Sequence, residues 1–414
     1  MHATRQAVIL VGGRGTRLGS ITADTPKPML EIEQGRVFLD YLLHSVVRQG
    51  FRQVVMLAGH LAQVVCDRYE HSTFMGAEID VIVEPEPLGT GGALRFAQPH
   101  LAEQFALING DTLFDVNLRA LDNELAAHPD ALGCIALRRV DDTRRYGSVS
   151  LDETGIITEF REKDATSDAQ SGLINGGMAL LRKASIAGMR SGTVSMEKEI
   201  YPPLVARGAL RGVVCNGYFL DIGLPETLGI ARNDLPRQRR PVLFLDRDGV
   251  LNEDSGYVSR IEDWRWIAGV KLLIRRANDL GIAVIVVTNQ AGIARGFYDE
   301  GAVLALHERI NQELRQFGAF VDAFYYASDH PEAVDGAYRT PDPLSRKPRA
   351  GMLARAVRTH HLDTHRALLV GDKSSDVEAA QSLGIPALRY VSGRIDDFVF
   401  SSVLGQRLFG TNVN

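Results

Sequence analysis

The sequence predicts an α/β protein built from two Rossmann-like, three-layer domains, each a central sheet with helices on both faces. Apolar runs at residues 7–11 and 242–245 each lead into a loop dense in glycine or aspartate. Such runs are typical of buried parallel strands, which carry their ligand loops at their carboxyl ends. After each run, further short apolar stretches alternate with amphipathic segments, and this alternation indicates βαβ units.

The same pattern assigns the other elements in chain order. In the first half, strands are predicted at residues 7–11, 53–58, 79–83, 105–108, 133–137 and 178–181, and helices at 38–50 and 62–70. In the second half, strands are predicted at residues 242–245, 282–287, 323–326 and 367–370, and helices at 270–280, 300–317 and 350–360.

A basic, polar stretch bracketed by prolines lies between the two strand-and-loop systems, at residues 232–241. We interpret it as a linker because a new strand follows it at once, although a surface loop within one domain has the same composition. The predicted division is a first domain at 1–234, a linker at 235–241 and a second domain at 242–414.

Composition limits the classes of function. The 46 Lys and Arg residues nearly balance the 51 Asp and Glu residues, giving a net charge of −5, so no nucleic-acid partner is expected. No apolar run is long enough to cross a bilayer, and no signal peptide is recognised, so neither a membrane association nor export is expected. Three cysteines without CxxC spacing suggest neither disulfides nor a cysteine zinc site. The sequence therefore predicts a cytoplasmic enzyme that acts on small molecules.

The first loop has the residue types of a phosphate-binding loop. It follows the strand at 7–11 and reads Gly12-Gly-Arg-Gly-Thr-Arg-Leu18, which matches neither the P-loop nor the dinucleotide-binding pattern. Glycines at this position let backbone N–H groups approach a phosphate, and Arg17 adds positive charge. Lys27 stands between two prolines, where a second cation can reach the same polyphosphate.

Two aspartates in the first half each follow an apolar stretch. Asp111 comes after the predicted strand at 105–108, and Asp221 comes after the short stretch at 217–220. A pair of such carboxylates can hold Mg²⁺ against the oxygens of a triphosphate. Either residue taken singly is equally well explained as a helix cap or a turn residue.

These pieces together resemble the sugar-phosphate nucleotidyltransferase family, whose opening signature is GGxGTRL followed by PKPM. The resemblance covers residues 5–232 and continues through the following stretches: Glu86–Ala93, Phe160–Lys163, Asn175–Gly177 and Tyr218–Gly223. It implies a nucleotidyltransferase fold in which a sugar 1-phosphate oxygen attacks the α-phosphorus of a nucleoside triphosphate and expels pyrophosphate. A phosphate oxygen is already an anionic nucleophile, so positioning and charge neutralisation are sufficient for catalysis.

The resemblance also implies roles for individual residues. Arg17 and Lys27 are expected to act in catalysis, and Asp111 and Asp221 to bind Mg²⁺. The residues expected at the nucleotide are Gly12, Gly13, Gly15, Thr16, Arg17, Lys27, Gly89, Thr90 and Asp111. Those expected at the sugar phosphate are Gly147, Glu162, Lys163 and Asn175.

The second half places polar residues at three predicted strand ends. Asp246 and Asp248 follow the first strand, Thr288 follows the second, and Asp372 follows the strand at 367–370. Two carboxylates at i and i+2 can divide the work, one attacking phosphorus and the other moving the leaving-group proton. Capping and turn formation would explain one such strand end, but three in this order are unusual.

This order, together with Lys347, resembles the haloacid-dehalogenase-type phosphatases, with DxDG, then Thr, then Lys, then GDxxxD. The resemblance implies a haloacid-dehalogenase-like fold without a large cap. It makes Asp246 the nucleophile and Asp248 the general acid/base, while Thr288 and Lys347 hold the phosphoryl group. Magnesium is then expected on Asp246, Asp372 and the backbone carbonyl of Asp248.

Finer details are similar to the heptose-bisphosphate and histidinol-phosphate phosphatase branch, which implies substrate contacts for Asn289, Arg295, Arg346 and Lys347. That branch carries a zinc loop of CPxHP and CxCRKP. Here the corresponding stretches are Ala327–Pro331 and Pro343–Pro348, with all three cysteine positions replaced. A structural zinc site needs four ligands, so zinc is not expected.

The two resemblances imply consecutive reactions. The second domain resembles the D-glycero-D-manno-heptose 1,7-bisphosphate 7-phosphatases, and the first resembles the D-glycero-D-manno-heptose 1-phosphate guanylyltransferases. Two alternatives stay open: a transferase for another hexose 1-phosphate with UTP, dTTP or CTP, and a weak or non-catalytic phosphatase-like module. Nucleotidyltransferases of this kind often self-associate, so a homo-oligomer is compatible with the sequence, which does not determine the oligomeric state.

Overall fold

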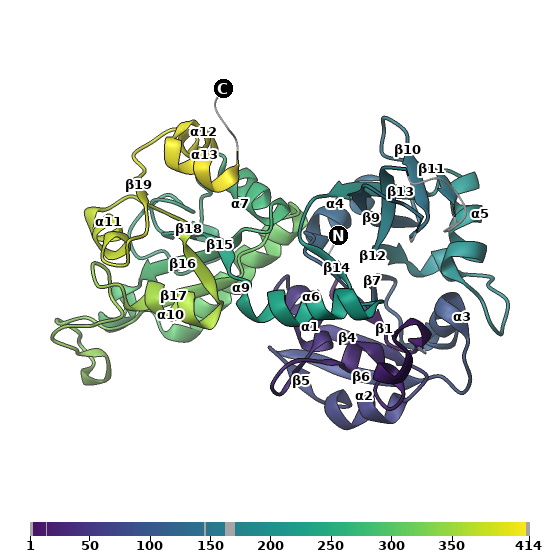
Figure 1. Ribbon diagram of the computed structural model, residues 1–414. Coiled ribbons are helices and arrows are strands. Elements are labelled where there is room, and N and C mark those ends of the chain that lie inside the picture. Colours follow the sequence, from purple (N-terminus) through teal and green to yellow (C-terminus); the bar gives the residue numbers. More distant parts are fainter. Residues whose placement is uncertain (1–2, 14, 145, 162–169, 411–414) are drawn as a thin grey trace. The chain divides into compact units, whose positions relative to one another are not determined.

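The computed structural model describes residues 3–13, 15–144, 146–161 and 170–410 (Figure 1). Contacts between residues divide the chain into two compact units, residues 1–237 and 238–414. Each unit is an α/β structure with its own sheet. Among the described residues, no helix has the length and apolar character required to cross a membrane.

The first unit is built on a mixed sheet with the strand order β11-β10-β12-β7-β1-β4-β6-β5. Strand β9 also pairs with β12, and β13 pairs with β9. Its parallel centre consists of β7, β1, β4 and β6. The strands of this sheet are β1 (Gln6–Leu10), β4 (Gln53–Ala58), β5 (Thr73–Phe74), β6 (Ala77–Val83), β7 (Gln104–Asn109), β9 (Gly133–Val140), β10 (Ser148–Leu151), β11 (Ile157–Arg161), β12 (Gly172–Arg182) and β13 (Leu210–Cys215). Two small sheets pair β2 (Glu31–Glu33) with β3 (Arg36–Val37), and β8 (Thr112–Phe114) with β14 (Phe219–Asp221).

Helices cover both faces of this sheet because its strands are apolar on both sides. Along β1, Ala7 and Ile9 belong to one buried cluster and Val8 to the other. The first cluster includes α1 (Phe38–Val47), α2 (Ala62–Tyr69), α4 (Leu118–Ala127) and α6 (Pro225–Asp234). The second includes α3 (Gly89–Phe96) and α5 (Tyr201–Ala206). This alternation produces the three layers.

The second unit has a wholly parallel sheet with the order β17-β16-β15-β18-β19. Its strands are β15 (Arg240–Leu245), β16 (Ala283–Asn289), β17 (Ala323–Ala327), β18 (Leu362–Gly371) and β19 (Ala387–Arg389). Its helices are α7 (Val270–Asp279), α8 (Ala291–Ala294), α9 (Glu300–Gln316), α10 (Gly351–Thr359), α11 (Ser374–Gln381), α12 (Ile395–Ser401) and α13 (Val403–Phe409). Between β15 and α7, the described residues form loops and one short 3₁₀ turn, without a cap domain.

The two buried clusters of this unit again lie on opposite faces of the sheet. Leu243 and Leu245 of β15 pack with α7 and α9, whereas Val242 and Phe244 pack with α10 and α11. The predicted fold class, two three-layer α/β domains, is confirmed.

Every predicted strand and helix corresponds to an element of the structure, but the bounds differ and several elements were not predicted. Strand β12 starts six residues before the predicted 178–181, because glycines at 176 and 177 interrupt its apolar run where the pairing with β9 is irregular. Helix α6 runs to Asp234, and β15 begins at Arg240, so the last residues of the predicted linker 235–241 belong to a strand.

Candidate active sites

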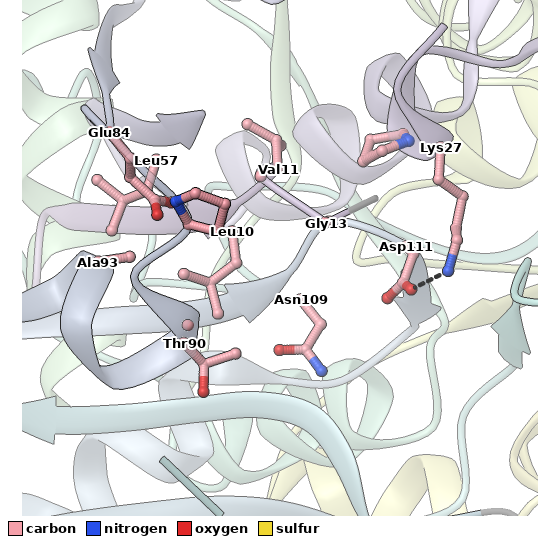
Figure 2. Close-up of a pocket in the computed structure, with 15 residues that line it drawn as sticks. Leu10, Val11, Gly13, Lys27, Leu57, Glu84, Thr90, Ala93, Asn109 and Asp111 are labelled. Atoms are coloured by element: carbon pink, nitrogen blue, oxygen red, sulfur yellow. Dashed lines mark hydrogen bonds and ion pairs between the residues drawn. The ribbon is translucent and has the colours of Figure 1, made fainter. Parts of the chain in front are cut away.

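A cavity of about 380 Å³ opens at the carboxyl ends of β1 and β7 in the first unit (Figure 2). Its lining combines the glycine loop after β1, the loop after β7 and the start of α3. The predicted nucleotide residues in its lining are Gly12, Gly13, Lys27, Gly89, Thr90 and Asp111. Thr16 and Arg17 are exposed on the 3₁₀ helix that follows Gly15.

Lysine and aspartate meet at one side of this cavity. Lys27 is 8% exposed, and its Nζ lies 2.8 Å from Oδ2 of Asp111. Burial of the ammonium group is tolerated because this carboxylate neutralises it. The pair thus keeps one cation fixed beside the glycine loop, where phosphate oxygens can replace or share the carboxylate contact.

The two predicted magnesium ligands of the first unit lie together. Strand β14 pairs with β8 so that Asp221 stands opposite Thr112, and the Ile222 N–H donates to the Asp111 carbonyl at 3.0 Å. Burial raises the pKa of Asp221, and the negative charge of Asp111 raises it further. Two carboxylates that repel each other beside bound phosphate fit a divalent cation.

The opposite side of the cavity carries a carboxylate that the sequence analysis did not single out. Glu84 follows β6, lines the cavity and accepts the Leu88 N–H at 3.0 Å. Burial raises its pKa. Figure 2 shows Glu84 well separated from the Lys27–Asp111 pair. The Lys27–Asp111 pair thus lies on one side of the cavity, and Glu84 lies on the other side, close to Gly12 of the glycine loop.

A smaller cavity shares Leu10, Thr90 and Asn109 with the first. Asn175, a predicted sugar contact, lines it together with Glu197. The Thr90 hydroxyl donates to Glu197 at 3.2 Å and accepts the Met196 N–H at 2.9 Å.

Three other predicted sugar contacts are not placed in this cavity. Gly147 is buried at the turn before β10, where its N–H donates to the Thr143 carbonyl at 3.0 Å. It lines neither cavity. Glu162 and Lys163 lie outside the described residues.

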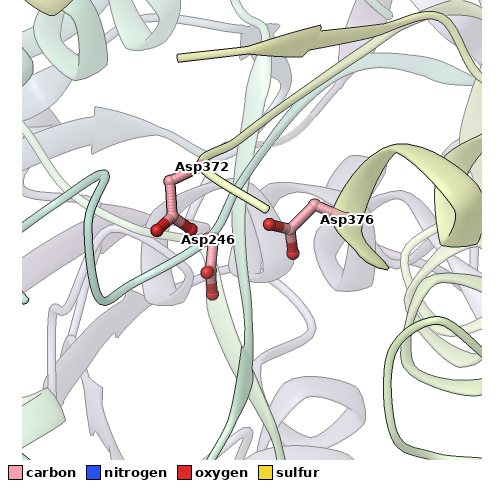
Figure 3. A group of neighbouring side chains, drawn as sticks. All are labelled: Asp246, Asp372 and Asp376. Carbon is pink, nitrogen blue, oxygen red and sulfur yellow. The ribbon is translucent and has the colours of Figure 1, made fainter. Parts of the chain in front are cut away.

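In the second unit, three carboxylates converge at the carboxyl ends of β15 and β18 (Figure 3). Asp246 follows β15, while Asp372 and Asp376 follow β18, and each offers an oxygen within 4.8 Å of the others. Lys347 joins them: its Nζ lies 2.8 Å from Asp246, 2.5 Å from Asp376 and 2.8 Å from the Val287 carbonyl.

Burial governs the charges of this cluster. It raises the pKa of Asp246 to about 7, although the charge of Lys347 opposes the shift. For Lys347, burial favours the neutral amine, but Asp246 and Asp376 outweigh it and raise its pKa. The lysine therefore stays charged beside the carboxylate of Asp246.

The donor set fits a magnesium ion. It consists of hard carboxylate oxygens, and Oδ1 of Asp372 is buried with no hydrogen-bond partner among the described residues. Gly249 has φ of 90°, and a Cβ there would lie 2.5 Å from Asp372 Oδ2, so only glycine leaves this carboxylate in place. The carboxylate of Asp248 points elsewhere, to Arg247 and Gln290.

Asn289, a predicted substrate contact, has a different place. Its side-chain amide donates to the Lys347 carbonyl and accepts the Lys347 N–H, both at 3.0 Å. Both of its polar atoms are therefore used to hold the backbone of Lys347. The substrate contact predicted for Asn289 stays a prediction beside this structural role.

Arg295 and Arg346 line an open cavity of about 780 Å³ that also includes Lys347 and His330. Burial lowers the pKa of Arg346, and the nearby charge of Arg295 lowers it further. Nη1 of Arg346 is buried without a hydrogen-bond partner among the described residues. Two guanidinium groups held close together fit a phosphate group.

The stretches that correspond to the zinc loop of the resembled branch make hydrogen bonds within the loop. Nδ1 of His330 accepts the Glu332 N–H at 3.0 Å, and Asp329 accepts the Ser345 hydroxyl at 3.4 Å. Arg339 donates two N–H groups to the Ala333 carbonyl at 3.0 and 2.7 Å. These hydrogen bonds link the two sides of the loop that leads to Lys347, and no cysteine of the chain lies beyond position 215.

Sequence reasoning passed over four residues at these sites. Asp376 was within the recognised GDxxxD motif, so a signal was present for it, whereas no site residue was predicted near Glu197. Gln290 follows Thr288 and Asn289 directly, but its position gave no indication of its contacts. Glu84 follows an apolar strand as the predicted aspartates do, and this was the signal that could have found it.

The folds and sites define two α/β units, one with a glycine-lined cavity beside Lys27 and Asp111, and the other with a cluster of three aspartates and a lysine. Residues 6–238 match the nucleotidyl transferase family, and residues 344–397 match a HAD-hydrolase-like family. The chain belongs to the nucleotidyl transferase family, and its second unit belongs with the HAD-like phosphatases.

Individual relatives match each unit separately. A D-glycero-alpha-D-manno-heptose 1-phosphate guanylyltransferase of Campylobacter jejuni is 35% identical over 222 residues, covering 53% of this chain and 96% of the relative. A D-glycero-beta-D-manno-heptose-1,7-bisphosphate 7-phosphatase of Rhodopseudomonas palustris is 42% identical over 161 residues, covering 39% of this chain and 89% of the relative. One solved structure is similar in fold alone: the crystal structure of a putative glucose-1-phosphate thymidylyltransferase from Bacillus anthracis. The match is 22% identical, has a TM-score of 0.50, and covers 56% of this chain and 94% of the chain in that structure.

Proposed function

We propose that this chain is a bifunctional enzyme that makes a heptose nucleotide sugar. The second unit removes the 7-phosphate of D-glycero-D-manno-heptose 1,7-bisphosphate, and the first unit transfers GMP from GTP to the resulting heptose 1-phosphate, releasing pyrophosphate. The observation that carries the proposal is the presence on one chain of two separate phosphate sites whose relatives catalyse chemically consecutive steps. We place these reactions in the cytoplasm.

In the transferase unit, the chain's own residues position and neutralise charge. The glycine loop after β1 lets backbone N–H groups approach the triphosphate, and Lys27 lies beside it. The sugar phosphate enters from the side of Asn175 and Glu197. Its phosphate oxygen forms the new bond to the α-phosphorus while the bond to pyrophosphate breaks. Asp111 and Asp221 would hold Mg²⁺, which neutralises charge on the phosphates.

In the phosphatase unit, Asp246 attacks the phosphorus and the bond from phosphorus to the sugar oxygen breaks, leaving an aspartyl-phosphate. Asp248 gives its proton to the departing sugar oxygen and then takes one from the water that hydrolyses the aspartyl-phosphate. Thr288 and Lys347 hold the phosphoryl oxygens. Asp246, Asp372 and Asp376, with the Asp248 carbonyl, would hold Mg²⁺, which screens the repulsion between carboxylate and phosphate.

The arginine pair explains a preference for a bisphosphate. Arg295 and Arg346 line the cavity that includes Lys347, so they are placed to receive a second phosphate on the same substrate. Their mutual repulsion is relieved when an anion binds between them.

The test is mass spectrometry of the products that the full-length chain makes from heptose 1,7-bisphosphate, GTP and Mg²⁺. We expect inorganic phosphate, pyrophosphate and GDP-heptose. Asp246→Asn is expected to abolish phosphate release from the bisphosphate while pyrophosphate release from heptose 1-phosphate and GTP continues. Asp111→Asn is expected to do the reverse. Higher turnover with UTP or dTTP and a hexose 1-phosphate would contradict the assignment of substrates.

A further inference from the structure

A buried amide links the acid/base carboxylate of the phosphatase unit to its phosphate-binding threonine. Gln290 is 1% exposed, and its Nε2 lies 3.1 Å from Oδ2 of Asp248 and 2.8 Å from the hydroxyl of Thr288. On its other side, Oε1 lies 2.8 Å from the hydroxyl of Tyr298. Its three hydrogen-bond partners are thus side-chain oxygens of Asp248, Thr288 and Tyr298, and its NH₂ group has a partner for each of its two hydrogens.

The chemistry of these contacts fixes the orientation of the amide. A carboxylate only accepts hydrogen bonds, so the group that faces Asp248 is the NH₂ group and the carbonyl oxygen faces Tyr298. The phenol donates to that oxygen, which holds the amide against rotation.

The position of Tyr298 depends on a glycine. A Cβ on Gly292 would lie 2.3 Å from the Tyr298 ring, so a side chain at position 292 would displace the phenol from Gln290. The segment that follows β16 therefore supplies both Gln290 and Tyr298, the residue that orients its amide.

This arrangement leaves the two oxygens of Asp248 unequal. Oδ2 accepts from Gln290 and from Arg247 Nη2 at 2.9 Å, whereas Oδ1 accepts from Arg247 Nε at 3.1 Å. With two donors on Oδ2, the free lone pair that can carry a proton is on Oδ1. The same amide fills a lone pair of the Thr288 oxygen, which leaves the hydroxyl hydrogen to donate in another direction.

We propose that Gln290, oriented by Tyr298, is a positioning residue that directs the proton of Asp248 to the leaving oxygen of the substrate. The inference rests on the proposed phosphatase function. It predicts a defect that depends on the leaving group, because a sugar alkoxide must be protonated as it departs and a p-nitrophenolate need not be.

The experiment compares two substrates with full-length Gln290→Ala in the presence of Mg²⁺. For heptose 1,7-bisphosphate we expect kcat to fall about 10- to 100-fold, because proton transfer from a misoriented Asp248 is less efficient. For p-nitrophenyl phosphate we expect a loss of less than about 3-fold, since no proton is required by the leaving group. The exposed Gln381→Ala is the matched control and keeps wild-type rates on both substrates.

A second variant tests the orienting phenol with less disturbance to the core. Tyr298→Phe frees the amide oxygen and is expected to lower kcat about 3- to 10-fold for the bisphosphate but not for p-nitrophenyl phosphate. Tyr326→Phe, whose hydroxyl donates to Glu300 at 2.8 Å, is the matched control.

Equal losses on both substrates, or wild-type rates in both variants, would overturn the positioning role. If the wild type hydrolyses neither substrate while its pyrophosphate release is intact, the proposed phosphatase function fails and the inference fails with it. If the wild type hydrolyses both and the variants show no selective loss, only the inference fails.

Discussion

Asn289 and Lys347 are 58 residues apart in the chain, yet the side-chain amide of Asn289 makes two hydrogen bonds to the backbone of Lys347. An amide carries a donor and an acceptor at the spacing of a peptide group, so it can clamp the N–H and the C=O of one residue at once. With its backbone fixed, Lys347 reaches Asp246 and Asp376 with a buried ammonium group. The backbone of Lys347 is thus positioned by two hydrogen bonds to a single side chain.

His307 on α9 has an environment that suits only the neutral ring. It stacks on Phe324 with centroids 4.3 Å apart, and neither ring nitrogen has a hydrogen-bond partner among the described residues. Burial lowers its pKa to about 3, and the charge of Arg247 contributes in the same direction. Folding therefore excludes a proton that the unfolded chain binds below pH 6.5.

The stability that depends on neutral His307 is complete above about pH 6.5 and is lost progressively as the pH falls toward 3. We expect His307→Leu to make the fall of Tm between pH 7 and pH 5 shallower than in the wild type, as measured by circular dichroism. The exposed His365→Leu is the control and keeps the wild-type slope. Identical slopes in His307→Leu and the wild type would contradict this account.

At the scale of elements, a short strand pair brings the two aspartates of the transferase unit together. Strands β8 and β14 are far apart in the chain, but their pairing places Asp221 next to the residue that follows Asp111. The pairing depends on close backbone approach at Gly217, where a Cβ would lie 1.7 Å from the Asp115 carbonyl oxygen. A side chain at this position cannot be accommodated without moving β14.

Gly217→Ala is expected to displace Asp221 from Asp111 and to lower pyrophosphate release from GTP and heptose 1-phosphate by at least about 10-fold. Phosphate release from the bisphosphate is expected to continue at the wild-type rate, because its site is in the other unit. Gly229→Ala on α6 is the control, since a Cβ there meets no atom within 4 Å. Full transferase activity in Gly217→Ala would show that β14 does not position the site.

Helix α3 shows why some elements were not predicted. Its sequence contains three glycines in eight residues, a composition unfavourable to an isolated helix. The glycines are needed by the tertiary structure: the N–H groups of Gly91 and Gly92 donate to the Val194 carbonyl, and a Cβ on Gly92 would lie 2.4 Å from the Gly192 carbonyl oxygen. Packing against residues 192–194 therefore overrides local propensity.

At the scale of the whole molecule, each unit contains its own core. The buried clusters of the first unit end at Leu235, and those of the second begin at Val242. The described side chains of each site come from one unit, so we expect each unit to fold and to bind phosphate by itself.

We expect fragments 1–237 and 238–414, expressed separately, to fold and to keep the transferase and phosphatase activities respectively. Circular dichroism and the two product assays check this. An unfolded or inactive fragment, alongside an active full-length chain, would show that the units depend on each other.

The sequence by itself determined the α/β class, the order of the main strands and the polar groups that follow them. Apolar periodicity is a local property, and the carboxyl ends of parallel strands meet at one edge of a sheet, so Asp246 and Asp372 could be expected to lie together. The tertiary structure decided the clamp of Asn289, the amide of Gln290 between Asp248 and Thr288, the entry of Asp376 into the cluster, and the position of Gly147 outside the lining of the two cavities in the first unit. These depend on strand register and on the close approach of distant backbone segments, and neither is encoded in the pattern of neighbouring residues.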